Sequence, residues 1–390
     1  MAKRVGGFIG QDGINAPDPA TEVTGTAGDE QVDVSFTSPS DVGGAAITEY
    51  RVTDSTGAHG ATGSSSPITV TGLTNGTSYT FNVWAINPFG WSSPSDASGS
   101  VSPAAARGVF SGGSGSGAGN VIDYITISST GNATDFGDLL ESSYTGGGMS
   151  SSTRGVFTIA NGGNSINYIT IATTGNAQDF GDTATSGNYQ TALSNSTRGV
   201  HRVGFRTTTM EYLTIATTGN SADFGDTIVS GYYEGMLASP TRGVLGGGRN
   251  TSNDPINVIQ YITIASTGNA TDFGDLTVAR YSGAGASNST RGLFMAVYDD
   301  GLNNVVDYIT IASTGNATDF GDTSAAATNG IAGTASSTRA IIAGGERSGT
   351  RTNVIGYFTI STTGNETDFG DLTIAKDGIA GLSNAHGGLS

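Results

Sequence analysis

The sequence contains no cysteine and only three histidines among its 390 residues. Without cysteine the chain can form no disulfide, no thiolate zinc site and no cysteine nucleophile. The three histidines, His59, His201 and His386, are too few for a histidine-built metal site or catalytic triad. We therefore predict that the protein has no metal site and no cofactor.

Charged side chains are also scarce. They make up 13% of the chain, and 16 basic residues stand against 33 acidic ones, for a formal net charge of -17. So few cations give no electrostatic footprint for nucleic acid or an anionic membrane. No apolar run approaches the roughly 18 residues of a membrane span, and residues 1–10 lack a signal-peptide core. We expect synthesis in the cytosol, no nucleic-acid partner and no membrane insertion.

Glycine, in contrast, is abundant, with 62 residues interleaved with apolar and β-branched runs. From residue 107 onward the sequence repeats a unit of 44 to 49 residues six times. Each copy opens with an arginine, places a tyrosine at the head of an alternating segment, and then carries an Asp-Phe-Gly-Asp tetrapeptide. The copies begin at Arg107, Arg154, Arg198, Arg242, Arg291 and Arg339. A period of this length, built from short β segments and turns, indicates a propeller or a solenoid.

A β-propeller is the better interpretation, because each copy supplies four strand-like segments. The fourth segment, such as 144–152, is rich in small residues and suits a crowded innermost strand. The first copy lacks that segment, and residues 377–385 match it. We therefore predict an all-β chain in which residues 104–390 form a six-bladed propeller closed by the C-terminal strand.

The order of segments in the repeat resembles kelch-type propellers. An apolar strand is followed by a glycine pair, as in Gly112-Gly113, and then by Asn-Val-Ile-Asp-Tyr, with phenylalanine where kelch repeats usually carry tryptophan. Copies three and five lack the glycine pair. The resemblance covers residues 104–390 and implies a closed ring of four-stranded blades.

Residues 16–103 do not carry the repeat. Strand-like runs such as Gln31–Phe36 and Thr80–Ala85 surround Gly72-Leu73-Thr74-Asn75-Gly76-Thr77-Ser78-Tyr79, and Asn87–Trp91 has the composition of a tight turn. These segments resemble a fibronectin type III sandwich. The resemblance implies that Tyr79 is buried and bonded to backbone near Leu73, and that Phe36 replaces a core tryptophan. Residues 1–15 then form an N-terminal arm.

The repeated Asp-Phe-Gly-Asp is similar to the Asp-box of sialidase-like propellers. In that family the box is a structural turn in which the aspartate accepts backbone hydrogen bonds. The resemblance implies a structural role, in the repeat turns, for Asp135, Asp179, Asp223, Asp272, Asp319 and Asp368. Calcium ligation by Asn132, Asp135, Asp138 and their equivalents is a less favoured alternative.

The six repeat arginines have two interpretations. They point into a central channel and bind an anion, or each pairs with an aspartate of a neighbouring blade. The surplus of acidic residues favours the second interpretation.

The least repetitive stretches are 200–206, 249–255 and 295–304. Insertions in a propeller collect on one rim, where they shape a binding face. Together with nearby aromatic residues, these stretches give Tyr232, Tyr233, Tyr298 and Arg249 as a candidate ligand face. No catalytic set accompanies them, so we expect no enzymatic activity.

The repeat also resembles repeats of bacteriophage structural proteins, particularly those of phages that infect marine cyanobacteria, in which fibronectin-type modules are common. The resemblance implies a virion protein that binds other virion proteins through the arm and the sandwich. Three functions remain: a tail or fibre appendage that attaches to host-surface polysaccharide, a capsid or neck decoration protein, and, less favoured, a sialidase-like glycan hydrolase.

Overall fold

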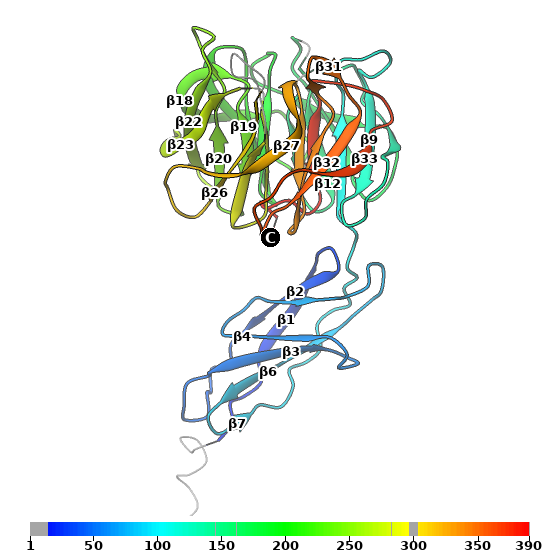
Figure 1. The fold of residues 1–390 in the computed structure, drawn as a ribbon. Helices are drawn as coiled ribbons and strands as arrows, with labels where there is room; N and C mark the ends of the chain where they lie inside the picture. The colour runs from blue at the N-terminus through cyan, green and yellow to red at the C-terminus, as the bar shows by residue number, and fades with distance from the viewer. Residues whose placement is uncertain (1–14, 145, 161, 282, 296–302, 390) are drawn as a thin grey trace, which may run out of the picture. The chain divides into compact units, whose positions relative to one another are not determined.

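The computed structural model describes residues 15–144, 146–160, 162–281, 283–295 and 303–389. The chain divides into two compact units, Met1–Ala105 and Ala106–Ser390. Within the described residues all regular structure is β-strand, and the ribbon in Figure 1 shows strands throughout both units. None of these residues belongs to a helix of the length and hydropathy that would cross a membrane.

The first unit consists of two antiparallel sheets around one core. One sheet contains β1 (Thr21–Ala27), β2 (Gln31–Thr37) and β5 (Ile68–Thr71), and the other contains β4 (Gly60–Gly63), β3 (Glu49–Asp54), β6 (Phe81–Asn87) and β7 (Gly90–Trp91). Alternate residues of β2 and β6 are buried, as expected for strands with one face on a core. Phe36 is 7% exposed and packs in this core, with its ring centroid 4.8 Å from that of Tyr50.

The predicted turns of the first unit are present. The Tyr79 hydroxyl accepts a hydrogen bond from the backbone N–H of Thr74, next to Leu73, at 3.0 Å. The ring is half-buried, less than the resemblance implied. At the turn after β6, Asn87 Oδ1 accepts the backbone N–H groups of Phe89 and Gly90. The side chain thereby replaces backbone partners that a two-residue turn cannot supply.

The second unit contains six sheets, each with four antiparallel strands at its centre. Most of the strands run in chain order from one edge of a sheet to the other. The first three sheets are β34 (Ala380–Ser383), β8 (Arg107–Ser111), β9 (Val121–Thr126), β10 (Thr134–Asp138); β11 (Gly148–Ser150), β12 (Arg154–Thr158), β13 (Ser165–Thr170), β14 (Gln178–Asp182); and β15 (Thr191–Ser194), β16 (Arg198–Arg202), β17 (Thr207–Thr214), β18 (Ala222–Tyr232), β21 (Arg249–Asn250). The other three are β19 (Gly235–Ala238), β20 (Arg242–Gly246), β22 (Ile256–Thr263), β23 (Thr271–Arg280); β24 (Ala284–Ser287), β25 (Arg291–Met295), β26 (Asn303–Thr310), β27 (Thr318–Asn329), β30 (Glu346–Arg347), β31 (Thr350–Arg351); and β28 (Ala332–Ala335), β29 (Arg339–Ala343), β32 (Val354–Thr359), β33 (Thr367–Asp371).

The first strand of each sheet contacts the first strands of two other sheets. We call these six strands the inner strands. Their contacts follow the cyclic order β34, β11, β15, β19, β24, β28 and back to β34. β34 pairs with β8 in antiparallel register, Ser383 opposite Gly108, so the end of the chain completes the first sheet. Inner strands are short and rich in Gly, Ala and Ser because side chains crowd where six strands converge.

The core of the second unit lies between neighbouring sheets. One buried cluster, for example, joins Val109 and Phe136 of the first sheet to Phe157 and Ile169 of the second. In each sheet the tyrosine of the third strand packs edge-on against the phenylalanine of the fourth, with ring centroids 5.9 to 6.2 Å apart. Each sheet is thus buried against its neighbours, so adjacent repeats stabilise one another.

Candidate functional site

The repeated Asp-Phe-Gly-Asp lies in a strand, which corrects the expectation of a turn. It forms part of β10, β14, β18, β23, β27 and β33, the strands that carry Asp135, Asp179, Asp223, Asp272, Asp319 and Asp368. The phenylalanine is buried, whereas the first aspartate is exposed. The pairing register shifts at the tetrapeptide in all six sheets, as in a β-bulge.

The bulge explains why the third residue is glycine. The φ angle of this glycine lies between 137° and 149° in the six copies. A Cβ atom on Gly181 would stand 2.5 Å from the carbonyl oxygen of Gly219, which belongs to the next repeat. The tetrapeptide is therefore fixed by backbone that approaches from the neighbouring sheet.

The side chain that caps this edge is an asparagine from the next repeat. Its Oδ1 accepts the backbone N–H of the second aspartate at 3.0 to 3.1 Å in all six copies. The pairs are Asp138–Asn176, Asp182–Asn220, Asp226–Asn269, Asp275–Asn316, Asp322–Asn365 and Asp371–Asn132. The sixth pair joins the last repeat to the first.

The alternative of calcium at this edge finds no support in the geometry. The Oδ1 atom of Asn132 is already occupied by the N–H of Asp371, and Asp135 is exposed. Among the described residues no group of three or more His, Cys, Asp or Glu side chains is placed to hold a metal ion.

The six repeat arginines follow neither of the two interpretations drawn from the sequence. Each guanidinium stacks on the tyrosine of its own sheet, 4.3 to 4.7 Å from the ring centroid. Each also donates to an isoleucine carbonyl of the next sheet at 2.8 to 3.0 Å. A planar guanidinium can stack and donate at once, so the acceptor is a peptide group and no carboxylate is needed.

The structure brings together three of the four residues of the candidate ligand face. Tyr232, at the end of β18, pairs with Arg249 of β21, so the non-repeating stretch 249–255 reaches the edge of the third sheet. Tyr233 follows directly, with its ring centroid 5.1 Å from that of Tyr232. Tyr298 lies outside the described residues. Tyr232 is only 5% exposed, so little of its side chain is accessible to a ligand.

Three aromatic residues that the sequence analysis missed complete a cluster with these tyrosines. The Tyr189 ring lies 4.7 Å from that of Tyr233, and Phe205 lies 4.6 Å from Tyr232 and is 46% exposed. Tyr281 lies 6.1 Å from Tyr233, and the Arg249 guanidinium stacks on it at 3.6 Å. We call Tyr189, Phe205, Tyr232, Tyr233 and Tyr281 the aromatic cluster.

Backbone strain is concentrated beside this cluster. Tyr189 and Tyr233 have φ angles of 60° and 67°, and Arg206 and Asn253 have 62° and 70°. Positive φ costs free energy in residues with a Cβ and persists where surrounding structure fixes it. Asn253 Oδ1 accepts hydrogen bonds from the Tyr232 hydroxyl at 2.8 Å and from Arg206 at 2.7 Å. These bonds hold the loops that carry the aromatic rings.

The cluster borders a cavity of about 50 Å³ where the chain enters the inner strands. Its lining includes Tyr189, Gln190, Tyr233, Glu234 and Ile331. Burial raises the pKa of the Tyr233 hydroxyl, and the neighbouring tyrosines raise it further. The hydroxyl therefore stays protonated, and it is hydrogen-bonded to the Tyr189 side chain.

Two polar side chains that line this cavity, Glu234 and Gln190, form bonds to other groups of the protein. Glu234, 2% exposed, forms an ion pair with Arg202 at 2.6 Å, and Arg202 is itself 1% exposed. Gln190, 1% exposed, donates from Nε2 to the Gly187 carbonyl, while its Oε1 has no hydrogen-bond partner within the described part of the chain. Buried polar atoms are normally paired, so this oxygen is available to a ligand or water.

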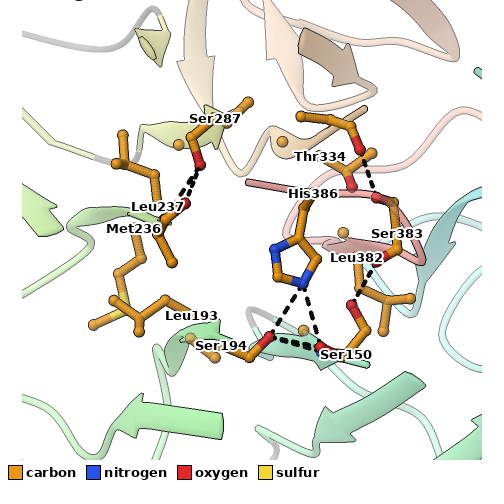
Figure 2. A pocket seen from close by; sticks show the side chains of 18 residues that line it. Ser150, Leu193, Ser194, Met236, Leu237, Ser287, Thr334, Leu382, Ser383 and His386 are labelled. Carbon is orange, nitrogen blue, oxygen red and sulfur yellow. Dashed lines mark hydrogen bonds between the residues drawn. The ribbon is translucent and has the colours of Figure 1, made fainter. Parts of the chain in front are cut away.

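A second cavity, of about 60 Å³, lies farther along the inner strands (Figure 2). His386, from the C-terminal segment, lies among these strands, with Nε2 3.3 Å from both Ser194 Oγ and the Ser150 carbonyl oxygen. Burial lowers the pKa of His386 to about 4. The His386 imidazole is therefore neutral where it lies among the inner strands.

Comparison with known proteins gives a match for the first unit. Residues 16–100 match the family model of the fibronectin type III domain. A crystal structure of domains from titin is 32% identical over 23% of this chain and 32% of that chain, with a TM-score of 0.21. This chain thus covers about a third of the titin chain. No curated protein matches the sequence. Residues 16–100, within the first unit, are therefore a fibronectin type III domain.

Proposed function

We propose that the six sheets of the second unit are the blades of a closed six-bladed β-propeller of kelch-like organisation. Three sets of contacts support this proposal: the cyclic order of the inner strands, the six asparagine caps and the six arginine bonds. In each set the last contact joins the sixth repeat to the first, as between Asp371 and Asn132 or between Arg339 and the Ile127 carbonyl. In a closed ring each sheet packs between two neighbouring sheets, so no sheet is left with an uncovered face.

The proposed function of the protein is attachment of a bacteriophage virion to a polysaccharide on the host surface, without enzymatic activity. The aromatic cluster is the observation that carries this proposal. Sugar rings stack their apolar C–H faces on aromatic side chains, and hydroxyl groups bond to nearby amides and carboxylates. Phe205 offers a ring that is 46% exposed and lies 5.6 Å from that of Tyr189, and Gln190, the next residue after Tyr189, lines the cavity with an unpartnered Oε1. Many copies on one particle would strengthen weak individual contacts.

A virion location rests on the likeness of the repeat to phage structural proteins. In this proposal the fibronectin type III domain and residues 1–15 bind other virion proteins, and the second unit carries the binding face. Among the described lining residues the one carboxyl group is that of Glu234, and it is paired with Arg202. A glycosidase would need two carboxyl groups facing one bond.

A purely structural decoration protein is the second candidate. Phe89 and Trp91, at the β6–β7 turn, are 45% and 51% exposed, and Arg51 stacks on Trp91 at 5.6 Å. Exposed aromatic residues of this kind are common at protein–protein interfaces. They are also compatible with attachment, because either function requires contact with the particle.

Immunogold electron microscopy of phage particles, with antibody raised against residues 104–390, tests the proposal. Attachment predicts gold at the tail tip or fibres, together with binding of the purified protein to host cells. Gold over the capsid or collar, without cell binding, would favour decoration. Particles that carry no gold would contradict a virion role.

A further inference from the structure

We propose that the cavity beside the aromatic cluster binds the terminal unit of a glycan, end-on, and that this unit is an uncharged sugar. The inference rests on the proposed attachment function and adds the class of ligand and its mode of binding. The chain enters the six inner strands at six positions, and all six line this cavity.

These six positions are equivalent by strand register. Each position stands four residues before an inner-strand residue, and that inner-strand residue pairs with the residue that follows the repeat arginine. In the third sheet, for example, Gln190 stands four residues before Ser194, and Ser194 pairs with Gly199. The set consists of Gly146, Gln190, Glu234, Gly283, Ile331 and Ile379, and all six line the cavity. Four are glycine or isoleucine, and the two polar residues are adjacent in the cyclic order. The cavity therefore has one polar side and one apolar side.

The aromatic residues lie on the polar side. Tyr189 and Tyr233 directly precede Gln190 and Glu234, whereas Gly330 and Gly378 occupy the same place before Ile331 and Ile379. A ligand that enters here meets tyrosine rings next to hydrogen-bonding groups. This combination fits the two faces of a pyranose ring, one of C–H groups and one of hydroxyl groups.

The size of the cavity limits what enters it. A volume of about 50 Å³ holds about four water molecules at roughly 10–15 Å³ each. The edge of one sugar ring, with two or three hydroxyl groups, replaces those waters. The space continues between the inner strands as far as the second cavity, which His386 lines, so a ligand enters from one end. The buried Oε1 of Gln190 and Oγ1 of Thr191 have no partner among the described residues, and they can accept bonds from sugar hydroxyls.

The charges around the cavity select against an acidic sugar. Glu234 is the only charged side chain among the described lining residues, and its partner Arg202 is committed to it. Arg249 is outside the lining and stacks on Tyr281. A carboxylate placed beside Glu234 would be desolvated without gaining a cation of its own.

The experiment measures binding of the full chain to immobilised glycans and, in parallel, to host cells. The glycans are uncharged trisaccharides ending in glucose, galactose, mannose or N-acetylglucosamine. Each is also presented with its non-reducing end capped by sialic acid or glucuronic acid. We expect binding to at least one uncapped trisaccharide and at least tenfold weaker binding to its capped form.

Three variants locate the site. Tyr233→Ala and Gln190→Leu should each weaken binding at least tenfold, and Leu140→Ala, which alters a residue that is 57% exposed elsewhere in the same unit, should not. If Gln190→Leu fails to fold, as judged by circular dichroism, Thr191→Val takes its place.

Each other outcome has a defined meaning. Equal or tighter binding to capped glycans, or binding unaffected by Tyr233→Ala, would overturn this inference and leave attachment standing. Cell binding without binding to any trisaccharide would overturn it also. Failure to bind both cells and glycans would contradict the attachment function itself.

Discussion

The outer edges of the six sheets differ from the loops that enter the inner strands in how strictly they follow the repeat. At the outer edge the bulge glycine and the asparagine cap recur six times, and within each sheet the arginine of the second strand stacks on the tyrosine of the third. At the entry loops, equivalent positions hold glycine, isoleucine, glutamine and glutamate. The repeated positions hold the sheets together, and the departures from the repeat build the candidate site.

The difference has a physical origin. A contact between neighbouring sheets is needed wherever two sheets meet, so the six sheets of the second unit require it repeatedly. A ligand contacts one place only, so a binding site needs residues that differ from their equivalents. Strain fits the same division, because Tyr189 and Tyr233 have φ angles of 60° and 67° at the entry loops, while at the outer edge the positive-φ position of the bulge is occupied by glycine.

The largest loss of stability is expected when the C-terminal strand β34 is deleted. Ending the chain at Asp377 removes β34 and uncovers the edge of β8, with the loss of buried Ile379 and Leu382. We expect the second unit to lose at least about 5 kcal/mol of stability, from two large core side chains and a strand pairing. Calorimetry should show a lowered transition for the second unit. An unchanged transition would contradict the role of β34.

A glycine pair tests the outer-edge contact itself. Gly181 and Gly219 have similar φ angles, 145° and 153°, but a Cβ at Gly181 meets the Gly219 carbonyl and a Cβ at Gly219 meets nothing within 4 Å. We expect Gly181→Ala to cost about 3 kcal/mol and Gly219→Ala about 1 kcal/mol. Urea denaturation measures both variants. Equal costs would mean that φ alone, without the approach of the next repeat, requires glycine.

The pH dependence of stability tests whether His386 is neutral among the inner strands. The pKa of His386 is lowered by burial to about 4 from 6.5. Below pH 6.5 the unfolded chain gains a proton that folded His386 does not accept until about pH 4, so stability falls as the pH drops through this window. The loss due to His386 should reach about 3 kcal/mol at pH 4. Stability measured against pH should fall less steeply in His386→Asn, and identical slopes would contradict a buried neutral histidine.

The smallest effect concerns the equivalence of the repeats. Lysine in place of Arg198 or Arg339 loses the stacking geometry and weakens the bond to the isoleucine carbonyl of the next sheet. Each change should cost about 1 kcal/mol, and the two costs should agree within about 0.5 kcal/mol. Thermal melting compares them. Costs that differ widely would show that the repeats are not interchangeable in energy.

The repeat in the sequence predicted the strand segments, because a period of conserved residue types within one chain reports a recurring local structure. It did not predict that Asp179 and its equivalents lie in a bulged strand, because a bulge forms only when the next repeat supplies backbone beside it. Nor did it predict the carbonyl partners of the arginines. Carbonyl groups are present at every residue and leave no mark on the sequence.

For the candidate site, the non-repeating stretches led to Tyr232, Tyr233 and Arg249 but not to Tyr189, Gln190 or Phe205. Aligning the copies on their inner strands carries the missing signal: Tyr189 stands where Gly330 and Gly378 stand in other copies. The alignment of the copies does not indicate Phe205, because this residue lies in a loop whose length varies between copies. Its neighbours are known only when the chain is folded.

The most direct test of this division compares host-cell binding by wild-type protein, Tyr233→Ala and Arg198→Lys. We predict that Tyr233→Ala weakens binding at least tenfold with little change in melting temperature, whereas Arg198→Lys lowers the melting temperature and leaves binding intact. Loss of binding in both variants in proportion to their loss of stability would contradict the claim that departures from the repeat form the binding site.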